Sequence, residues 1–330
     1  MPINKSAKLA RNLFNKKDVK RLPTRDGYGH GVLKIGTKNN QVVVLCADLI
    51  ESTRSHWFKE KFPERYVELG VAEQNLVAVA AGMAIGGKIP YITSYATFSP
   101  GRNNEQIRTL ACISDLPIKV IGSHAGVSVG PDGATHQALE DIALMRVLPR
   151  MTVLVPCDAV EAEKATITAA RINGPVYVRL AREKTPVMTT SKTSFKPGKA
   201  NIFWRGSDVT IIACGPLVHE ALLAAKVLES KKIKVEVINN STIKPLDEKT
   251  ILSSVRKTKA VVTVEEHQVN GGLGSAIAEL LGKKLPTPIE MIGLQDRFGE
   301  SGEPEELLKH FKLINPHIIQ AVKKVIRRKR

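Results

Sequence analysis

Residues 123–137 carry the densest set of chemically useful side chains in the sequence. Within this stretch there are two histidines, one aspartate, two serines, one threonine and three glycines. Glycine allows tight turns and close ligand approach, while His, Asp and hydroxyl groups can recognise a polyol. A structural loop could share this composition, and a metal site is disfavoured because Cys and Glu ligands do not cluster here. The segment favours a binding site for a hydroxylated ligand.

A second candidate is Glu73, in the segment 68–75. A predicted strand ends there, Gly70 turns the chain, and the Glu73 carboxylate falls in the first turn of the next helix. Such a carboxylate can simply complement the helix dipole, which is a common structural role. However, residues 76–84 are nearly all apolar, which predicts a buried helix. Its start would then lie at the carboxyl edge of a sheet, where α/β proteins bind ligands.

The elements that must position these residues alternate between strands and helices. In the first half of the chain, short runs rich in Val and Ile predict strands at 42–46, 90–95, 118–122, 152–155 and 176–180. Helical patterns fall between them at 73–86, 105–112, 137–147 and 159–172. Because the strands are apolar on both faces, we expect a parallel sheet covered on both sides.

The alternation stops between Ala181 and Gly206, where Thr, Ser, Lys and Pro predict a linker. A second series then has strands at 209–213, 235–238, 260–264 and 288–292, and helices at 219–230, 273–281, 303–311 and 318–326. We therefore predict two doubly wound α/β domains. The predicted divisions are a basic extension at 1–22, a first domain at 23–185, a linker at 186–206 and a smaller second domain at 207–330. Gly271-Gly272-Leu273-Gly274 could cradle an anion, but we interpret it as packing.

The charge is strongly positive. The chain has 49 basic and 32 acidic residues, a formal net charge of +17, and the excess is concentrated at its two ends. Such a charge favours anionic partners, either phosphorylated substrates or nucleic acid. Aromatic residues make up only 5% and do not interleave with basic ones, so nucleic-acid binding is not expected.

The remaining composition indicates a soluble protein of the cytoplasm. The four cysteines lie far apart in apolar settings, which favours buried thiols over disulfides or metal ligands. No stretch approaches the roughly 18 uninterrupted apolar residues of a membrane helix. The N-terminus lacks the apolar core of a signal peptide. We expect a cytoplasmic location and no membrane partner.

Three segments together resemble the transketolase family of thiamine diphosphate enzymes. They are Val-Ala-Glu-Gln-Asn around Glu73, the Gly-Pro-Asp-Gly-Ala-Thr-His-Gln run at 130–137, and Val-Glu-Glu-His at 264–267 with the glycines that follow it. The resemblance runs from about residue 23 to the end and covers the pyrimidine-binding and C-terminal domains of that family. The family's Gly-Asp-Gly motif, which helps to hold magnesium and the diphosphate, does not occur here. The chain therefore resembles the C-terminal subunit of a split transketolase.

The resemblance also implies partners and an activity. It implies an N-terminal subunit that holds most of the Mg²⁺ and diphosphate site, and self-association into a 2+2 heterotetramer. The implied reaction transfers a two-carbon ketol unit from a ketose phosphate to an aldose phosphate. No metal ligands are expected in this chain.

Roles for individual residues follow from the same resemblance. Glu73 matches the glutamate that hydrogen-bonds the cofactor's aminopyrimidine ring and promotes proton removal; a buried carboxylate suits that task. Phe98 matches the aromatic residue that packs on this ring, and Asp48 matches a residue near the thiazolium. His136 and Asp132 match residues that hydrogen-bond sugar hydroxyls near the reacting carbon. The resemblance implies that Glu73 and His136 are the catalytic residues.

A further set matches the residues that hold the sugar phosphate. Its members are Arg25, Ser52, His124 and Arg182. Arginines form bidentate, charge-assisted bonds to phosphate oxygens, so their presence is chemically sensible. Arg179 lies on the same run as Arg182 and could be confused with it.

The sequence departs from the family beyond Phe98. Family members usually place aromatics three and six residues later, whereas this chain has Gly101 and Asn104. Asn104 makes the predicted pyrimidine pocket less apolar.

Three other interpretations stay open. The β subunit of a 2-oxo acid dehydrogenase has the same two domains and the same glutamate, but an oxo acid needs no polyol and phosphate contacts. Deoxyxylulose-phosphate synthase shares Asp132 and His136 but usually lacks a Ser-His pair at 123–124. A non-catalytic RNA-binding or scaffold protein would also account for the +17 charge.

Overall fold

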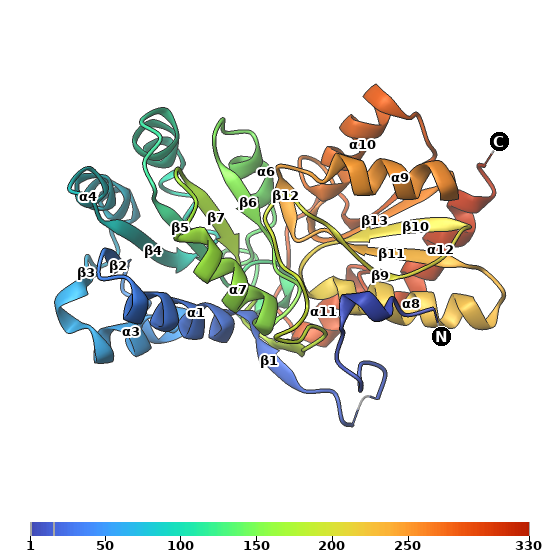
Figure 1. Ribbon diagram of the computed structural model, residues 1–330, viewed down its shortest axis with the longest axis horizontal. Helices are drawn as coiled ribbons and strands as arrows, with labels where there is room; N and C mark the ends of the chain where they lie inside the picture. The colour runs from blue at the N-terminus through green and yellow to red at the C-terminus, as the bar shows by residue number, and fades with distance from the viewer. Residues whose placement is uncertain (1, 16, 330) are drawn as a thin grey trace.

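The computed structural model describes residues 2–15 and 17–329 and contains two α/β units side by side (Figure 1). The first unit is built on a seven-stranded sheet with strand order β12-β6-β7-β5-β4-β2-β3. Its strands are β2 (Val42–Cys46), β3 (Tyr66–Glu68), β4 (Ile89–Tyr95), β5 (Lys119–Ser123), β6 (Thr152–Leu154), β7 (Val176–Arg179) and β12 (Thr242–Lys244). All neighbouring pairs are parallel except β12 with β6. The predicted parallel sheet is confirmed.

Helices cover both faces of this sheet. On one face α1 (Thr24–Lys38) and α7 (Ala159–Ala169) pack against the strands. On the other lie α4 (Glu73–Ile85), the π-helical turn η3 (Ile107–Ile113) and α6 (Asp141–Arg146). Helices α1 and α7 touch at Gly27, where an added Cβ would lie 2.1 Å from the Ala159 carbonyl oxygen. Shorter helices are α2 (Ile50–Thr53), α3 (His56–Lys61) and α5 (Asn104–Gln106).

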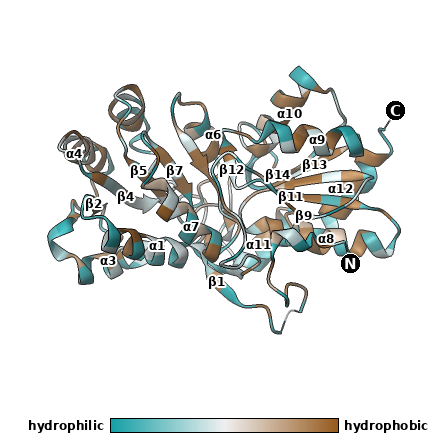
Figure 2. Cartoon of the chain, viewed as in Figure 1, coloured by the Kyte–Doolittle hydropathy of each residue, from teal (hydrophilic) through white to brown (hydrophobic). Residues whose placement is uncertain are grey.

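The second unit has a five-stranded sheet with strand order β14-β13-β10-β11-β9. Its strands are β9 (Asn201–Trp204), β10 (Val209–Ala213), β11 (Val235–Asn239), β13 (Val261–Gln268) and β14 (Ile289–Leu294). Helices α8 (Val218–Ser230) and α12 (Asn315–Ile326) pack on one face, and α9 (Glu248–Thr258) and α10 (Leu273–Lys284) on the other. α11 (Pro304–His310) lies beside the first unit's 127–129 turn. Figure 2 shows these central strands in brown, as expected for an apolar core.

The segment predicted to be a linker, 186–206, contains ordered structure. β9 within it pairs antiparallel with β11, and β8 (Lys184–Pro186) pairs with β1 (Arg21–Pro23) at its start. Conversely, β12 comes from the later part of the chain and joins the first sheet. Three-residue edge strands carry too few positions for an alternating pattern, so the sequence gives little signal for them.

The predicted basic extension, 1–22, packs against the second unit within its described residues. The Asn4 amide donates to the Phe203 carbonyl at 2.9 Å, and Phe14 packs edge-on against Trp204 with ring centroids 5.9 Å apart. Leu13 is buried in the second core, and its carbonyl accepts from the His219 ring at 2.9 Å. The extension therefore has apolar residues between its cations, and these residues pack on the second unit.

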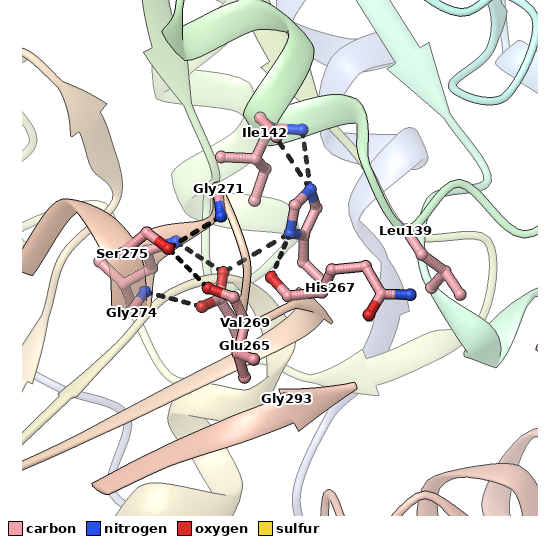
Figure 3. A network of polar contacts seen from close by, with 12 residues as sticks. Leu139, Ile142, Glu265, His267, Val269, Gly271, Gly274, Ser275 and Gly293 are labelled. Carbon is pink, nitrogen blue, oxygen red and sulfur yellow. Dashed lines mark hydrogen bonds and ion pairs between the residues drawn. The ribbon is translucent and has the colours of Figure 1, made fainter. Parts of the chain in front are cut away.

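The two units share one apolar core and a buried polar junction. The larger cluster joins residues under α4 and α6 with residues under α9 and α10. At the junction, Glu265 accepts from the Leu273 and Gly274 amides at 2.6 and 2.7 Å (Figure 3). His267 donates to the Gln268 carbonyl at 2.7 Å and accepts from the Ile142 amide at 3.2 Å.

Within the described residues, no helix is long and apolar enough to cross a bilayer. All four cysteines are buried free thiols, as predicted.

Candidate functional site

The predicted site residues follow the carboxyl ends of adjacent strands in the first sheet. Asp48 follows β2, Phe98 follows β4, His124 follows β5 and Arg182 follows β7. These four strands are neighbours in the order β7-β5-β4-β2. Loops beyond the carboxyl ends of parallel strands meet at one edge, so the topology gathers these side chains from distant parts of the chain.

Glu73 is the first residue of α4, and its side chain is only 4% exposed. Arg102 supplies its counter-charge, donating to the two carboxylate oxygens at 3.2 and 3.3 Å. The Asn103 side chain donates to the Glu73 carbonyl at 3.0 Å and fixes the start of the helix. Burial of an unpaired carboxylate is costly, so the ion pair with Arg102 stabilises Glu73 in this position.

Phe98 lies directly beside this ion pair. The Arg102 guanidinium stacks over its ring with a 4.1 Å separation from the centroid. Its other neighbours are Tyr95, at 5.9 Å between centroids, and His136, edge-on at 5.3 Å. Arg102 thus covers the Phe98 face and the Glu73 carboxylate at once.

His124 continues the row of rings. It stacks on Tyr95 at 3.9 Å between centroids, and its Nδ1 lies 2.9 Å from the Ser123 hydroxyl. Its backbone has a φ of 58°, in the left-handed region, and such outliers often occur at functional sites. Burial, followed by the charges of Arg25 and Arg182, lowers the pKa of His124 to about 2. The ring is therefore neutral at physiological pH.

Arg25 connects His124 to the loop after β2. Its Nη1 lies 3.2 Å from the His124 Nε2 and donates to the Ser52 carbonyl at 2.9 Å. Its Nε is buried and has no partner among the described residues. Burial and then the nearby charge of Arg54 lower its pKa. An orphaned guanidinium donor beside like charges is a physical signature of a site for an anion.

Arg182 and Arg179 are clearly distinguished by their surroundings. Arg182 is half-buried, donates to the Val129 carbonyl at 2.6 Å and lies 3.6 Å from the Asp132 carboxylate. Arg179 is buried, and its Nε donates to Asp141 at 2.7 Å while Nη2 binds the Glu266 carbonyl. Arg179 therefore holds the two units together, and Arg182 is the arginine that borders the site.

Two predicted residues are less well connected. Asp48 is exposed; its amide donates to the Glu68 carboxylate at 2.7 Å, and its side chain has no contact with the other predicted residues among those described. Ser52 contacts Arg25 through its backbone carbonyl and not through its hydroxyl.

His136 is half-buried, and its Nδ1 lies 2.9 Å from the Thr135 hydroxyl.

Three residues of the site were not predicted. Tyr95 ends β4 and packs between Phe98 and His124, and its position three residues before Phe98 was the available signal. Arg54 follows α2, pairs with Asp26 at 2.7 Å and adds positive charge near Arg25. Arg102 carried no sequence signal of its own.

The second unit supports the histidine loop. Glu266 accepts from the Ser128 amide at 2.7 Å, and Gly126 allows this approach because a Cβ there would lie 2.3 Å from the Glu266 carboxylate. Gln137 donates to the Glu300 carbonyl at 2.9 Å from the other end of the loop. Loop position therefore depends on contacts between the units.

The surroundings of Glu73 fit a heteroaromatic ring with polar nitrogen atoms. The Phe98 face offers stacking, Glu73 offers a carboxylate, and the buried Asn104 amide nitrogen lacks a partner among the described residues. That Asn104 makes the pocket of the cofactor's ring less apolar stays a prediction. The described residues contain no group of three or more side chains that could hold a metal ion.

Comparison with known proteins identifies the family. Residues 20–188 match the profile described as transketolase, pyrimidine binding domain, and residues 198–318 match the one described as transketolase, C-terminal domain. The chain belongs to the transketolase family. This family is dependent on thiamine diphosphate, whose aminopyrimidine ring suits the surroundings of Glu73.

Relatives place the chain at the C-terminal section of transketolase. It is 42% identical to a protein named as a transketolase C-terminal section from Methanocaldococcus jannaschii, over 90% of this chain and 94% of that one. It is 38% identical to human transketolase, covering 93% of this chain but 49% of the human protein. The structure of a split gene transketolase, described as an inactive beta4 tetramer, matches with a TM-score of 0.88 and 44% identity, over 94% of this chain and 100% of that one.

Proposed function

We propose that this transketolase C-terminal subunit supplies the acid–base glutamate and the sugar-phosphate pocket of an enzyme that transfers a two-carbon ketol unit. The observation that carries this proposal is the unbroken row of contacts from Glu73 through Arg102, Phe98, Tyr95 and His124 to Arg25. One end of the row holds a buried carboxylate, and the other holds clustered cations. The relatives named above are all transketolases, and none is a 2-oxo acid dehydrogenase.

Glu73 and Phe98 would hold the aminopyrimidine ring of thiamine diphosphate. When bound, this cofactor supplies a nucleophilic carbon and stores the transferred unit. Glu73 would share a proton with a ring nitrogen, and its near-complete burial strengthens that hydrogen bond because the local dielectric is low. Phe98 would orient the ring by stacking.

Arg102 occupies both contacts that this role requires. Its guanidinium covers Phe98 and binds Glu73, so it must move aside before a ring can use the same surfaces. Its side chain is half exposed, which leaves room for that movement. Until then, the ion pair with Arg102 offsets the cost of burying the Glu73 carboxylate.

At the other end of the site, Arg25, His124 and Arg182 would bind the sugar phosphate. Burial lowers the pKa of His124 most, and the charges of Arg25, Arg182 and Arg54 lower it further, so three guanidinium groups lie near this ring. Such a concentration favours a phosphate dianion over a singly charged group. A relative that is 40% identical is named a 6-deoxy-6-sulfo-D-fructose transketolase subunit, so a sulfonate sugar is the informative comparison substrate.

Between these ends, His136 and Asp132 would bind the sugar hydroxyls. The edge-on contact of His136 with Phe98 places its ring beside the surface proposed for the cofactor. Asp132 is exposed and close to Arg182, so it lies toward the phosphate end. Asp48 would lie near the thiazolium ring of the cofactor. The Ser52 hydroxyl would bind the sugar phosphate.

A partner polypeptide would complete the site with the Mg²⁺ and diphosphate ligands. Exposed apolar side chains flank α4: Val71, just before its start, is 68% exposed, and Ile85, at its far end, is 77% exposed, while Ile113 on η3 is 58% exposed. Exposed apolar side chains on adjacent helices are typical of a subunit interface. We propose that an N-terminal transketolase subunit covers them within a 2+2 heterotetramer in the cytoplasm.

Reconstitution tests this proposal. The purified chain and a candidate N-terminal subunit are assayed separately and together for ketol transfer from fructose 6-phosphate, with thiamine diphosphate and Mg²⁺ present. Neither protein alone should be active, and activity should saturate at equal amounts of the two. Robust activity of this chain alone would contradict the proposal. Replacing fructose 6-phosphate by its 6-sulfo analogue should lower kcat/KM; a higher value would reassign the substrate class.

A further inference from the structure

A basic pocket lies at the opposite end of the molecule from Glu73. It has a volume of about 890 Å³ and is formed by the end of α9, the turn before β14 and the residues after α12. Lys259 lies two residues before β13 and Pro288 immediately precedes β14, so the pocket lies at the amino edge of the second sheet. In Figure 1 this is the region around the C-terminus, whereas α4 and its neighbours lie at the far left.

Five of the ten residues that line this pocket are cationic, and none is acidic. They are Arg256, Lys259, Arg327, Arg328 and Lys329. Arg328 donates to Glu290 at 2.6 Å, and Lys329 donates to the Asp208 carbonyl. Among the described residues, Arg256, Lys259 and Arg327 have no ion pair. Within residues 2–15 and 17–329, three guanidinium or ammonium groups around the pocket therefore have no carboxylate within ion-pair distance.

Complementation of helix dipoles explains only part of this charge. Arg256 lies in the last turn of α9, and Arg327 caps the end of α12, where cations are common. Each helix end supplies roughly half a negative charge. Two such ends therefore offset about one of the cations, and most of the positive charge stays uncompensated.

The pocket also has an apolar side. Leu285, Pro286 and Pro288 line it together with the cations. A flat cationic surface would suit an extended polyanion, whereas a concave pocket of this size with an apolar side suits a compact ligand. Burial, opposed by Asp208 but reinforced by the charge of Lys259, lowers the pKa of Lys329, and a bound anion would relieve that repulsion.

We propose that this pocket is a second anion site, separate from the sugar site, and that it binds a small polyphosphate such as a nucleoside triphosphate. The uncompensated cations would bind the phosphates, and the apolar side would contact the organic part. Because the site lies in the second unit, at the edge remote from Glu73, binding there leaves the sugar site open.

Direct binding tests the proposal with ATP, tripolyphosphate and adenosine as probes, measured by calorimetry on the full chain. ATP and tripolyphosphate should both bind, and adenosine should not. In the double variant Arg256→Gln and Arg327→Gln, affinity for both polyphosphates should fall at least about tenfold, because two charge-assisted contacts are lost. Tighter binding of ATP than of tripolyphosphate would show that the apolar side contributes.

A charge-matched control separates the pocket from the general charge of the protein. Lys192→Gln and Lys196→Gln remove the same two charges from exposed positions between the units. This variant should bind ATP within about twofold of the original chain, since isolated surface charges contribute little. Equal losses in both double variants would overturn the proposal. So would loss of binding on Arg25→Ala alone, or binding of a short RNA in preference to both polyphosphates.

Discussion

The carboxyl edges of the two parallel sheets carry the same residue types and use them differently. At the first edge, Glu73 pairs with the half-exposed side chain of Arg102, and His124 and His136 belong to an open row of rings. At the second edge, Glu265 and His267 are fully buried, and backbone groups satisfy them. These side chains are shielded from solvent, and both nitrogens of His267 and both carboxylate oxygens of Glu265 already have backbone partners.

Glu266 connects these two regions. It belongs to the closed edge but holds the Ser128 amide of the loop that carries His124 and His136. Backbone partners therefore distinguish supporting residues from reacting ones, although both sets occur in the sequence as Glu and His after a predicted strand.

The largest expected effect comes from the open edge. Glu73→Gln keeps the size of the side chain but cannot take up a proton. With the N-terminal subunit present, ketol transfer should fall by roughly 10²- to 10⁴-fold. Assembly, measured by analytical ultracentrifugation, should not change. A Gln variant that keeps most of its turnover would show that Glu73 is as structural as Glu265.

The phosphate end of the open edge should give the next effect. Arg25→Ala should raise KM for fructose 6-phosphate strongly, since loss of a buried charged contact costs roughly 2–5 kcal/mol. Hydroxypyruvate, an unphosphorylated donor that does not reach Arg25, should keep its kinetic constants. Steady-state kinetics with both donors check this, and Arg182→Ala should show the same contrast. Equal losses on both donors would mean that these arginines hold the fold or the interface.

The two buried glutamates at the closed edge provide a matched pair with a smaller effect. Glu265→Gln and Glu266→Gln should each destabilise the fold by about 1–3 kcal/mol, because each removes a carboxyl oxygen that accepts a hydrogen bond from a buried amide. Only Glu266→Gln should also raise KM, by roughly tenfold, through displacement of the histidine loop. Chemical denaturation and steady-state kinetics measure the two effects. A raised KM in Glu265→Gln would contradict the division between support and loop positioning.

The strands of the first sheet were predictable because burial on both faces leaves a continuous apolar signal. β2 is observed at the predicted residues, 42–46, and β4 and β5 differ by one residue at their ends. β9, β12 and α9 were not predicted. The first two are short edge strands, and their pairing depends on distant parts of the chain.

The candidate site was predicted mainly from its resemblance to a family. Arg102 shows why physical reasoning on the sequence could not complete it. Its contacts with Glu73 and Phe98 depend on how the turn after β4 folds back on α4. The predicted helix 105–112 is instead a short α5 followed by the π-helical η3, which changes where these side chains point.

One measurement tests the difference between the two edges most directly. The histidine rings of the full chain are observed by NMR during titrations with acid and with fructose 6-phosphate, and are assigned with single His→Gln variants. The lowered pKa of His124 means that its ring stays neutral in the folded chain when pH falls below the ordinary value near 6.5. The folded state is therefore destabilised as the pH falls through that value, because unfolding lets the ring take up a proton.

The phosphate dianion should offset the charges of Arg25 and Arg182, so binding should raise the pKa of His124 and shift the resonances of His124 and His136. The resonances of His267 should not move, because its two nitrogens are already bonded to the backbone. A response at His267, or none at His124, would contradict the assignment of the open edge as the substrate site.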